Sequence, residues 1–394
     1  MTDFQQARNR TLTHARTVVV KVGSAVLSDA CGLNFSVMSA LAGQMVLLRN
    51  AHQGAVRRWV LVSSGAVAAG MAVLASAGQN PDNANLAARQ AAAAVGQGQL
   101  MRAWDAAFAE NGVKTAQILL TRDDLRSRER FLNIRNTVAA LLDWNVVPIV
   151  NENDTVSVSE LKFGDNDCLA SLLVNLTGAD VFINLTSAPG VQADDPRRAP
   201  DAPVLEYIEH IAVLDLKRLC GGKTSSGSGG MYSKLLAARR AAQIGVPTLI
   251  LPGRAPHILE RAFGLGESRG PADGRGTWVL PSDHAIPRRK FWMAYQSEPV
   301  GMVGIDSGAA NALLRMGGSL LPGGVRSVEG AFQKGALVRV THDGRNLGVG
   351  LSNYSAAQLK KIMGLKRHEV AVVLGDAHYP EVIHRDNLLL DAAV

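Results

Sequence analysis

The chain has 394 residues, more than one hydrophobic core usually supports, so two domains are expected. Apolar residues make up 47%, and 41 Lys plus Arg against 34 Asp plus Glu give a formal net charge of +7, which suits anionic ligands without singling out nucleic acid. Three cysteines, far apart and without a CxxC pair, argue against disulfides and a zinc site. We expect a cytoplasmic protein, because the first sixteen residues lack a secretory apolar run and no stretch is apolar enough to cross a membrane.

The first predicted strand is residues 17–23, TVVVKVG, an apolar β-branched run that ends at a glycine. Lys21 interrupts this run. A lysine in a buried strand loses hydration unless an anion meets it, so Lys21 near the strand end indicates a ligand. The alternative is an alternating strand with Lys21 on a solvated face.

A helix over residues 35–53 and a strand over 59–62 complete a first βαβ unit. That strand runs into SSGAVAAGM, where Ser64 and Gly65 begin a helix of small residues. Its free backbone N–H groups could receive a carboxylate or phosphate. Close helix packing and simple capping would explain the same residues.

Residues 83–111 are Ala-rich and helical, and the glycines at 96 and 98 suggest two helices with a break between them. Gly96-Gln97-Gly98 is not a dinucleotide-binding fingerprint, because Met101 stands where the third glycine is needed. A strand over 114–120 and a charged helix over 125–144 follow.

Residues 146–168, VVPIVNENDTVSVSELKFGDNDC, begin as a buried strand and then carry two polar clusters, NEND and GDND. Side chains just past the carboxyl end of a parallel strand face the crevice where open α/β sheets bind ligands. Two amide and carboxylate clusters there suggest a site. The alternative is that NEND forms a turn and GDND caps the helix predicted over 166–176.

After a strand over 180–185 and a Pro, Gly and Asp-rich loop, residues 221–234 read GGKTSSGSGGMYSK. This is not a Walker A motif, since the required spacing of its glycines is absent. Its glycines still expose backbone N–H groups, and it enters a helix over 231–243 with Lys234 in the first turn. A phosphate could be held there; the alternative is a flexible linker. A strand over 246–251 follows.

Residues 264–287 lose periodicity and are rich in Gly, Pro and Arg, which indicates a domain boundary. Short β-like runs over 301–305, 336–340 and 370–374, with a helix over 309–316, predict a small, mostly β, barrel-like domain. The predicted organisation is a basic N-terminal tail, a first domain, a linker, a second domain and a C-terminal tail over 1–16, 17–266, 267–287, 288–375 and 376–394.

In a mostly parallel sheet the features at the strand ends would project toward one edge. Two lysines, a glycine-rich cradle and fixed acids are what phosphoryl transfer needs, because its catalysis is mainly positioning and neutralisation of phosphate charge. No Ser-His-Asp order, HExxH motif or metal-like His spacing is visible in the sequence.

The motifs VVVKVGSAVL, VLVSSGAVAAGM, ENGVKTAQILLTRDDL, RERFLNIRNT, VVPIVNENDTV, KFGDNDCLAS and GSGGMYSKL resemble, in order and spacing, the bacterial glutamate 5-kinase family. The later RKFWMAY and GGSLLPGGVRSVEGAFQKGALVRV resemble the PUA domain of many members. The resemblance covers nearly the whole chain. It implies an amino acid kinase fold, an α/β/α sandwich with a mostly parallel sheet, followed by a small mostly-β PUA barrel.

The family transfers phosphate from ATP to the side-chain carboxylate of L-glutamate, the first step of proline biosynthesis. By family position Lys21 would bridge the attacking and transferring groups, Lys234 would hold the phosphate, and Asp165 would orient both lysines. The substrate-binding residues so implied are Ser64, Gly65, Asn151, Asp154, Asn166 and Asp167. The implied ATP-binding residues are Lys21, Gly23, Thr186, Ser187, Gly229, Gly230 and Lys234. Asp154 would pair with the α-ammonium group of glutamate, and Mg²⁺ would be held by phosphate and water, without direct protein ligands.

The chain departs from the family pattern around the nucleotide. Ser187 replaces a usual acid, Val191 and Gln192 replace Leu and Tyr, and Ala25 replaces a usual Ser. These differences concern nucleotide affinity and base preference, not the class of reaction.

The resemblance implies proline as a feedback inhibitor, glutamyl phosphate reductase as a functional partner, and a homodimer or homotetramer. Another acceptor within the same fold is an alternative. A second alternative is RNA binding or modification through the PUA domain, since Phe291, Trp292 and Tyr295 lie among basic residues and could stack bases. The same aromatic residues could instead belong to the domain's own core.

Overall fold

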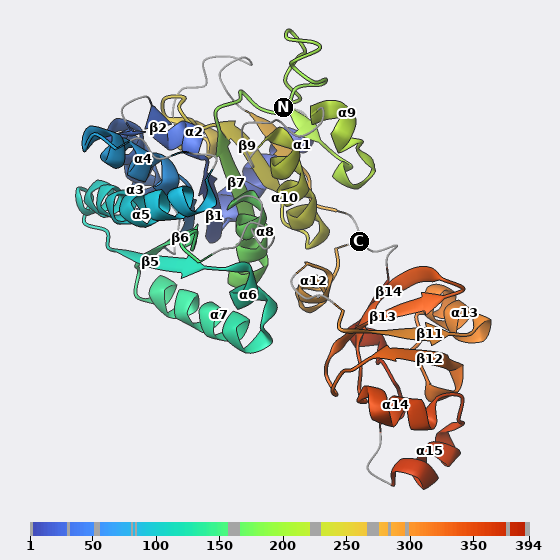
Figure 1. Ribbon diagram of the computed structural model, residues 1–394. Helices are drawn as coiled ribbons and strands as arrows, with labels where there is room; N and C mark the ends of the chain where they lie inside the picture. Colours follow the sequence, from blue (N-terminus) through green and yellow to red (C-terminus); the bar gives the residue numbers. More distant parts are fainter. Residues whose placement is uncertain are drawn as a thin grey trace. The chain divides into compact units, whose positions relative to one another are not determined.

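The computed structural model describes residues 3–29, 32–50, 56–79, 82, 85–156, 166–220, 230–265, 276–282, 285–295, 299–375 and 379–390 (Figure 1). The chain divides into two compact units, residues 1–285 and 286–394. Among the described helices, none is both long and apolar enough to span a bilayer.

The first unit is built on an eight-stranded sheet with the order β5-β6-β4-β1-β7-β9-β10-β8. Its strands are β1 Thr17–Val22, β4 Arg58–Ser63, β5 Thr115–Leu120, β6 Val147–Glu152, β7 Val181–Thr186, β8 Tyr207–Ile208, β9 Thr248–Pro252 and β10 Thr277–Val279. All neighbouring pairs are parallel except β9 with β10. The mostly parallel sheet predicted from buried apolar runs is thus confirmed.

Helices cover both faces of this sheet (Figure 1). They are α1 Asp3–His14, α2 Ser24–Leu27, α3 Phe35–Asn50, α4 Ala66–Ser76, α5 Leu86–Ala109, α6 Arg122–Arg126, α7 Arg128–Asp143, α8 Asn166–Thr177, α9 Leu216–Cys220, α10 Met231–Gln243 and α11 Ile258–Ala262, with the 3-10 turn η1 Ile211–Val213 and the small pair β2 Ser28–Asp29 and β3 Gly32–Leu33. Val18, Val20 and Val22 of β1 join the core beneath α3 and α5. Side chains alternate along a strand, so Lys21 points to the opposite face, where α8 packs.

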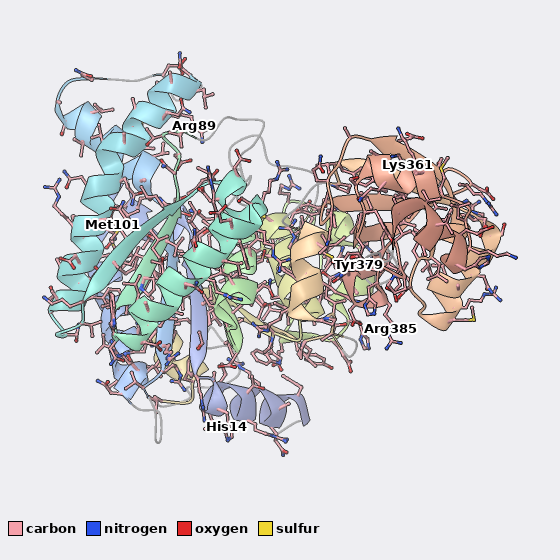
Figure 2. The ribbon with its side chains drawn as sticks, turned by 90° about the horizontal axis from the view of Figure 1, so that it is seen from below. His14, Arg89, Met101, Lys361, Tyr379 and Arg385 are labelled. Atoms are coloured by element: carbon pink, nitrogen blue, oxygen red, sulfur yellow. The ribbon has the colours of Figure 1, made fainter. Side chains whose placement is uncertain are left out.

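The N-terminal stretch predicted as a basic tail forms α1, so this prediction was wrong for residues 3–14. Figure 2 marks the end of this helix at His14. Buried Arg57 donates hydrogen bonds to the carbonyl oxygens of Leu12, Ala15 and Leu48, and its guanidinium lies over the Phe263 ring. Burial lowers the pKa of Arg57 to about 10. The contacts that hold α1 therefore come from residues distant in sequence, which local periodicity does not reveal.

The glycines at 96 and 98 do not break the chain into two helices, because α5 runs without interruption through them. A Cβ on Gly96 would lie 1.9 Å from the carbonyl oxygen of Ala66, and one on Gly70 would lie 1.7 Å from that of Ala92. These glycines therefore let α4 and α5 approach backbone to backbone. The prediction of a break was wrong because Gly96 serves packing between helices.

Gly96→Ala is expected to destabilise the protein by about 1–3 kcal/mol, since the added methyl group has backbone atoms in its way. Gly98→Ala is the matched control on the same helix, because a Cβ there meets nothing within 4 Å. The control should stabilise the protein by roughly 0.5–1 kcal/mol through helix propensity. Urea unfolding of both variants checks this, and equal changes of the same sign would contradict it.

The first unit extends beyond the predicted boundary of its domain. β10 lies within residues 267–287, which the sequence predicts as a linker, yet it pairs with both β9 and β8. The linker prediction was wrong for these residues. A three-residue strand carries too little periodicity to be recognised between Gly and Pro-rich segments.

The second unit has its own five-stranded sheet, with the order β12-β11-β13-β14-β15. Its elements are α12 Arg288–Tyr295, β11 Gly301–Ile305, α13 Ser307–Met316, η2 Pro322–Gly324, β12 Val325–Gly330, β13 Leu337–His342, β14 Arg345–Leu351, α14 Ala356–Ile362, α15 Arg367–Leu374, η3 Arg385–Asn387 and β15 Leu388–Leu390. The predicted separate, mostly β domain is confirmed.

Three details of the second unit differ from or qualify the sequence predictions. Residues 370–374 belong to a helix, α15, rather than to a strand. The predicted C-terminal tail contains β15, which pairs with β14. Phe291 is fully buried and so is not available to stack a base, whereas the side chains of Trp292 and Tyr295 lie outside the described residues.

Candidate active site

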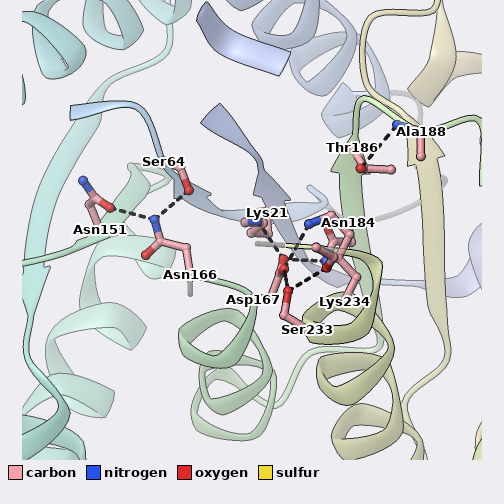
Figure 3. Close-up of polar contacts among 11 residues, drawn as sticks. Lys21, Ser64, Asn151, Asn166, Asp167, Asn184, Thr186, Ala188, Ser233 and Lys234 are labelled. Carbon is pink, nitrogen blue, oxygen red and sulfur yellow. Dashed lines mark hydrogen bonds and ion pairs between the residues drawn. The ribbon is translucent and has the colours of Figure 1, made fainter. Parts of the chain in front are cut away.

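The polar residues of the first unit gather where its central strands end (Figure 3). In the sheet order β6-β4-β1-β7, Asn151 comes from β6, Ser64 follows β4, Lys21 lies on β1 and Thr186 ends β7. Parallel strands bring their carboxyl ends to one edge, which is the usual ligand site of open α/β sheets. Figure 3 shows the same order in space, with the amides on one side, the lysines in the middle and Thr186 beyond them.

The centre of the site is one carboxylate between two lysines. Asp167, in the first turn of α8, forms an ion pair with each lysine. Lys21 Nζ lies 2.7 Å from its Oδ1, and Lys234 Nζ lies 3.0 Å from its Oδ2. Their side chains are 0%, 2% and 6% exposed, respectively, so these charges are nearly removed from water. Two ammonium groups against one carboxylate leave this trio with a net positive charge, which suits a phosphate group.

Two neutral side chains also donate hydrogen bonds to this carboxylate. Asn184 Nδ2 donates to Oδ1 of Asp167 at 2.8 Å, and Ser233 Oγ donates to Oδ2 at 2.7 Å. Each carboxylate oxygen thus receives one ammonium and one neutral donor. We expect this arrangement to hold the carboxylate in one orientation, and with it both ammonium groups.

A second group of side chains, the amide cluster, consists of Ser64, Gln97, Asn151 and Asn166. Asn166 Nδ2 donates to Ser64 Oγ at 2.8 Å and to Asn151 Oδ1 at 2.9 Å. Asn151 Nδ2 donates to Gln97 Oε1 at 2.8 Å. Residues from three helices or strands and one strand-to-helix turn therefore meet beside the lysines.

Three glycines of the site, Gly23, Gly65 and Gly230, have different structural roles. Gly65 precedes α4 with φ +116°, a backbone conformation that favours glycine. A Cβ on Gly23 would lie only 3.9 Å from Lys21 Nζ, so this position borders the ammonium group. Gly230 precedes α10, and its carbonyl oxygen lies 2.8 Å from Ser233 Oγ.

Two of the residues predicted to contact the nucleotide, Thr186 and Ser187, lie at the end of β7 and directly after it. Thr186 is buried, and its Oγ1 accepts a hydrogen bond from the backbone N–H of Ala188 at 3.4 Å. Ser187 is exposed at the start of the following loop.

Some predicted site residues lie elsewhere or outside the described part of the chain. Asp154 is partly buried in the turn that follows β6. Asp165 and Gly229 lie outside the described residues. The contacts that the sequence predicts for Asp165 are made by Asp167, which was predicted to bind substrate.

Sequence reasoning missed three contributors, Asn184, Ser233 and Gln97. Asn184 had a signal, since it is the polar residue inside the otherwise apolar run VFINL. Ser233 directly precedes Lys234, and Gln97 stands within an Ala and Gly-rich helix, so neither differs from an ordinary polar residue of a helix.

The chain is similar to known proteins over its whole length. A model described as the amino acid kinase family matches residues 16–252, and a PUA domain model matches residues 301–374. A protein of Nitratidesulfovibrio vulgaris is 59% identical over 100% of both chains, and one of Oleidesulfovibrio alaskensis is 56% identical over 100% of both. A protein of Geobacter sulfurreducens is 44% identical over 97% of this chain and 100% of its own length. All three are named glutamate 5-kinase.

Proposed function

We propose that this chain, which belongs to the amino acid kinase family and continues into a PUA domain, phosphorylates the side-chain carboxylate of L-glutamate with ATP. The product is L-glutamyl 5-phosphate, the first intermediate of proline biosynthesis. The observation that carries the proposal is the order of groups along the sheet edge: amides, then two buried lysines on Asp167, then Thr186. An acceptor, a transferring phosphate and a nucleotide would be arranged in this order.

The reaction needs no general base. A carboxylate of pKa about 4.3 is already an anion at neutral pH. One of its oxygens forms a bond to the γ-phosphorus while the bond from phosphorus to the β,γ-bridging oxygen breaks, and ADP leaves with that electron pair. The main obstacle is repulsion between the acceptor anion and the triphosphate, so positive charge is the chief requirement.

The two lysines would supply this positive charge from two different elements, β1 and α10. Lys21 comes from β1, near the amide cluster, and would bridge the attacking carboxylate and the transferring phosphate. Lys234 lies in the first turn of α10, whose N-terminal end also favours an anion, and would hold the transferring or leaving phosphate. Asp167 acts on both by fixing their ammonium groups.

The amide cluster and its neighbours would bind glutamate. Ser64 and Asn166 present side-chain polar groups from separate elements, with Asn151 supporting them. Asp154, in the turn after β6, would pair with the α-ammonium group. Gly65 would allow the ligand to approach the start of α4.

The nucleotide would lie toward β7, against Thr186, Ser187, Gly23 and Gly230, with Gly229 as a further contact. The residues that the structure describes contain no group of three or more His, Cys, Asp or Glu able to ligate a metal together. We propose that Mg²⁺ would be held by phosphate oxygens and water, which are ligands that this ion prefers. When bound with ATP, it would neutralise phosphate charge.

Proline is the proposed feedback inhibitor, and a glutamyl phosphate reductase is the proposed functional partner, because the acyl phosphate product is labile and needs rapid consumption. We further propose a homodimer or homotetramer located in the cytoplasm. RNA binding by the PUA domain stays a prediction, which binding to structured RNA at low salt would test.

Purified protein should release ADP in a glutamate-dependent manner, and millimolar proline should inhibit this release by raising the apparent KM for glutamate. Both results follow if proline occupies part of the glutamate site. A coupled ADP assay over a matrix of glutamate and proline concentrations measures this. Aspartate, acetylglutamate and UMP serve as alternative acceptors, and a preference for any of them over glutamate would contradict the proposal.

A further inference from the structure

One backbone N–H group determines the direction of the side-chain amides in the amide cluster. The N–H of Glu152 donates to Asn151 Oδ1 at 2.9 Å. A backbone N–H can only donate, so the oxygen and nitrogen of the Asn151 amide cannot exchange places. Asn151 Nδ2 must then face an acceptor, and Gln97 Oε1 occupies that position at 2.8 Å.

The orientation of the other two amides follows from that of Asn151. Asn166 Nδ2 donates a hydrogen bond to Asn151 Oδ1, so Asn166 Oδ1 does not take part in this contact. Gln97 Oε1 accepts a hydrogen bond from Asn151 Nδ2, so Gln97 Nε2 does not take part in this contact. Asn166 Oδ1 and Gln97 Nε2 are both buried and lack a hydrogen-bond partner within the described part of the chain. Buried polar groups are normally paired, so an acceptor on Asn166 and a donor on Gln97 call for partners.

Gln97 reaches this cluster because of the glycine before it. Gly96 brings α5 against α4 at a distance that no Cβ would allow. The next residue along α5 thereby lies within hydrogen-bond distance of Asn151 at the end of β6. The Gly-Gln-Gly segment is no dinucleotide fingerprint. It instead brings a glutamine side chain to the amide cluster.

We propose that Gln97 is a positioning residue for the acceptor amino acid, acting through Asn151. Its Oε1 holds the Asn151 amide, Asn151 holds the Asn166 amide, and the cluster then presents a fixed set of donors and acceptors to the ammonium and carboxylate groups of the ligand. This inference rests on the proposed function, since it assigns Gln97 to the glutamate side of that site rather than to the lysines or the nucleotide.

Gln97→Met removes the acceptor oxygen at nearly constant side-chain volume. It should raise the KM for glutamate about 10- to 100-fold, the change that corresponds to one buried polar group left unpaired. The KM for ATP and the kcat at saturating glutamate should stay unchanged, since Lys21, Asp167 and Lys234 are not touched. Gln99→Met, on the same helix, is the matched control and should leave both KM values unchanged.

A double-mutant cycle with Asn151→Ala separates positioning from a general structural effect. If Gln97 acts through Asn151, Gln97→Met should add little to the KM for glutamate in the Asn151→Ala background. Fully additive effects, or a KM for glutamate that Gln97→Met leaves unchanged in an active enzyme, would overturn the inference. Gln97→Leu serves the same test should the methionine variant not fold. Absence of glutamate-dependent activity in the unsubstituted protein would instead refute the proposed function.

Discussion

Lys21→Met is expected to lower the kcat of glutamate-dependent ADP release by about 100- to 1,000-fold, the usual cost of removing one preorganised charge from a transition state. The methionine side chain is unbranched and apolar, so it can fill the buried space that the lysine stem occupies. The loss should therefore appear in kcat more than in the KM for glutamate. Steady-state kinetics at saturating ATP measure it.

Lys114→Met is the matched control for Lys21→Met, because Lys114 is exposed just before β5. It makes the same chemical change far from the strand-end cluster and should leave kcat unchanged. A Lys21→Met protein that is folded, as judged by its thermal unfolding transition, and retains near-normal turnover would show that Lys21 is not the bridging charge.

Asp167→Asn is expected to reduce both activity and stability. The carboxylate is fully buried between two ammonium groups, so its neutralisation leaves two cations without their shared anion. Removing one partner of a buried ion pair costs about 3–5 kcal/mol of folding stability. Because both lysines lose their orientation together, kcat should fall at least as far as in Lys21→Met. Urea unfolding and steady-state kinetics measure the two effects.

Asp143→Asn provides the comparison for Asp167→Asn. Asp143 pairs with Arg58 at 2.9 Å, but both side chains are largely exposed, at 62% and 47%. Such a surface pair contributes about 0–1 kcal/mol, so this variant should unfold almost like the unsubstituted protein. If Asp167→Asn loses no more stability than Asp143→Asn and keeps its activity, the lysines do not depend on Asp167.

The sequence predicted the central strands from their apolar runs and Lys21 from its place inside one of these runs, whereas Lys234 was predicted from the glycine-rich segment that leads into its helix. Lys21 and Lys234 lie 213 residues apart in the chain, by subtraction of their numbers, yet both were expected at one edge because parallel strands end together. Their meeting at one shared carboxylate follows from the start of α8 at Asn166, which places Asp167 in the first turn. GDND contains two aspartates, and the sequence does not indicate which of them faces the lysines.

Other parts of the structure depend on contacts that no local pattern reveals. The continuity of α5 depends on the backbone contact of Gly96 with α4, whereas isolated glycines in a sequence usually suggest a break. The position of α1 depends on Arg57, more than forty residues away. The run VAVVL fits a short strand and a short helix equally well; its helical state follows from Glu369, whose carboxylate accepts the N–H of Lys366 at 2.6 Å and caps α15.

The most direct test of the proposed reaction is chemical identification of the phosphorylated group. The protein is incubated with ATP, Mg²⁺, L-glutamate and hydroxylamine. Hydroxylamine reacts with the acyl phosphate that the protein forms, displaces phosphate and gives a stable hydroxamate. The expected product is the side-chain (γ) hydroxamate of glutamate, formed in an amount equal to the ADP released, and it should be absent with Lys21→Met. ADP release without any glutamyl hydroxamate, or formation of the α-hydroxamate, would contradict transfer to the side-chain carboxylate.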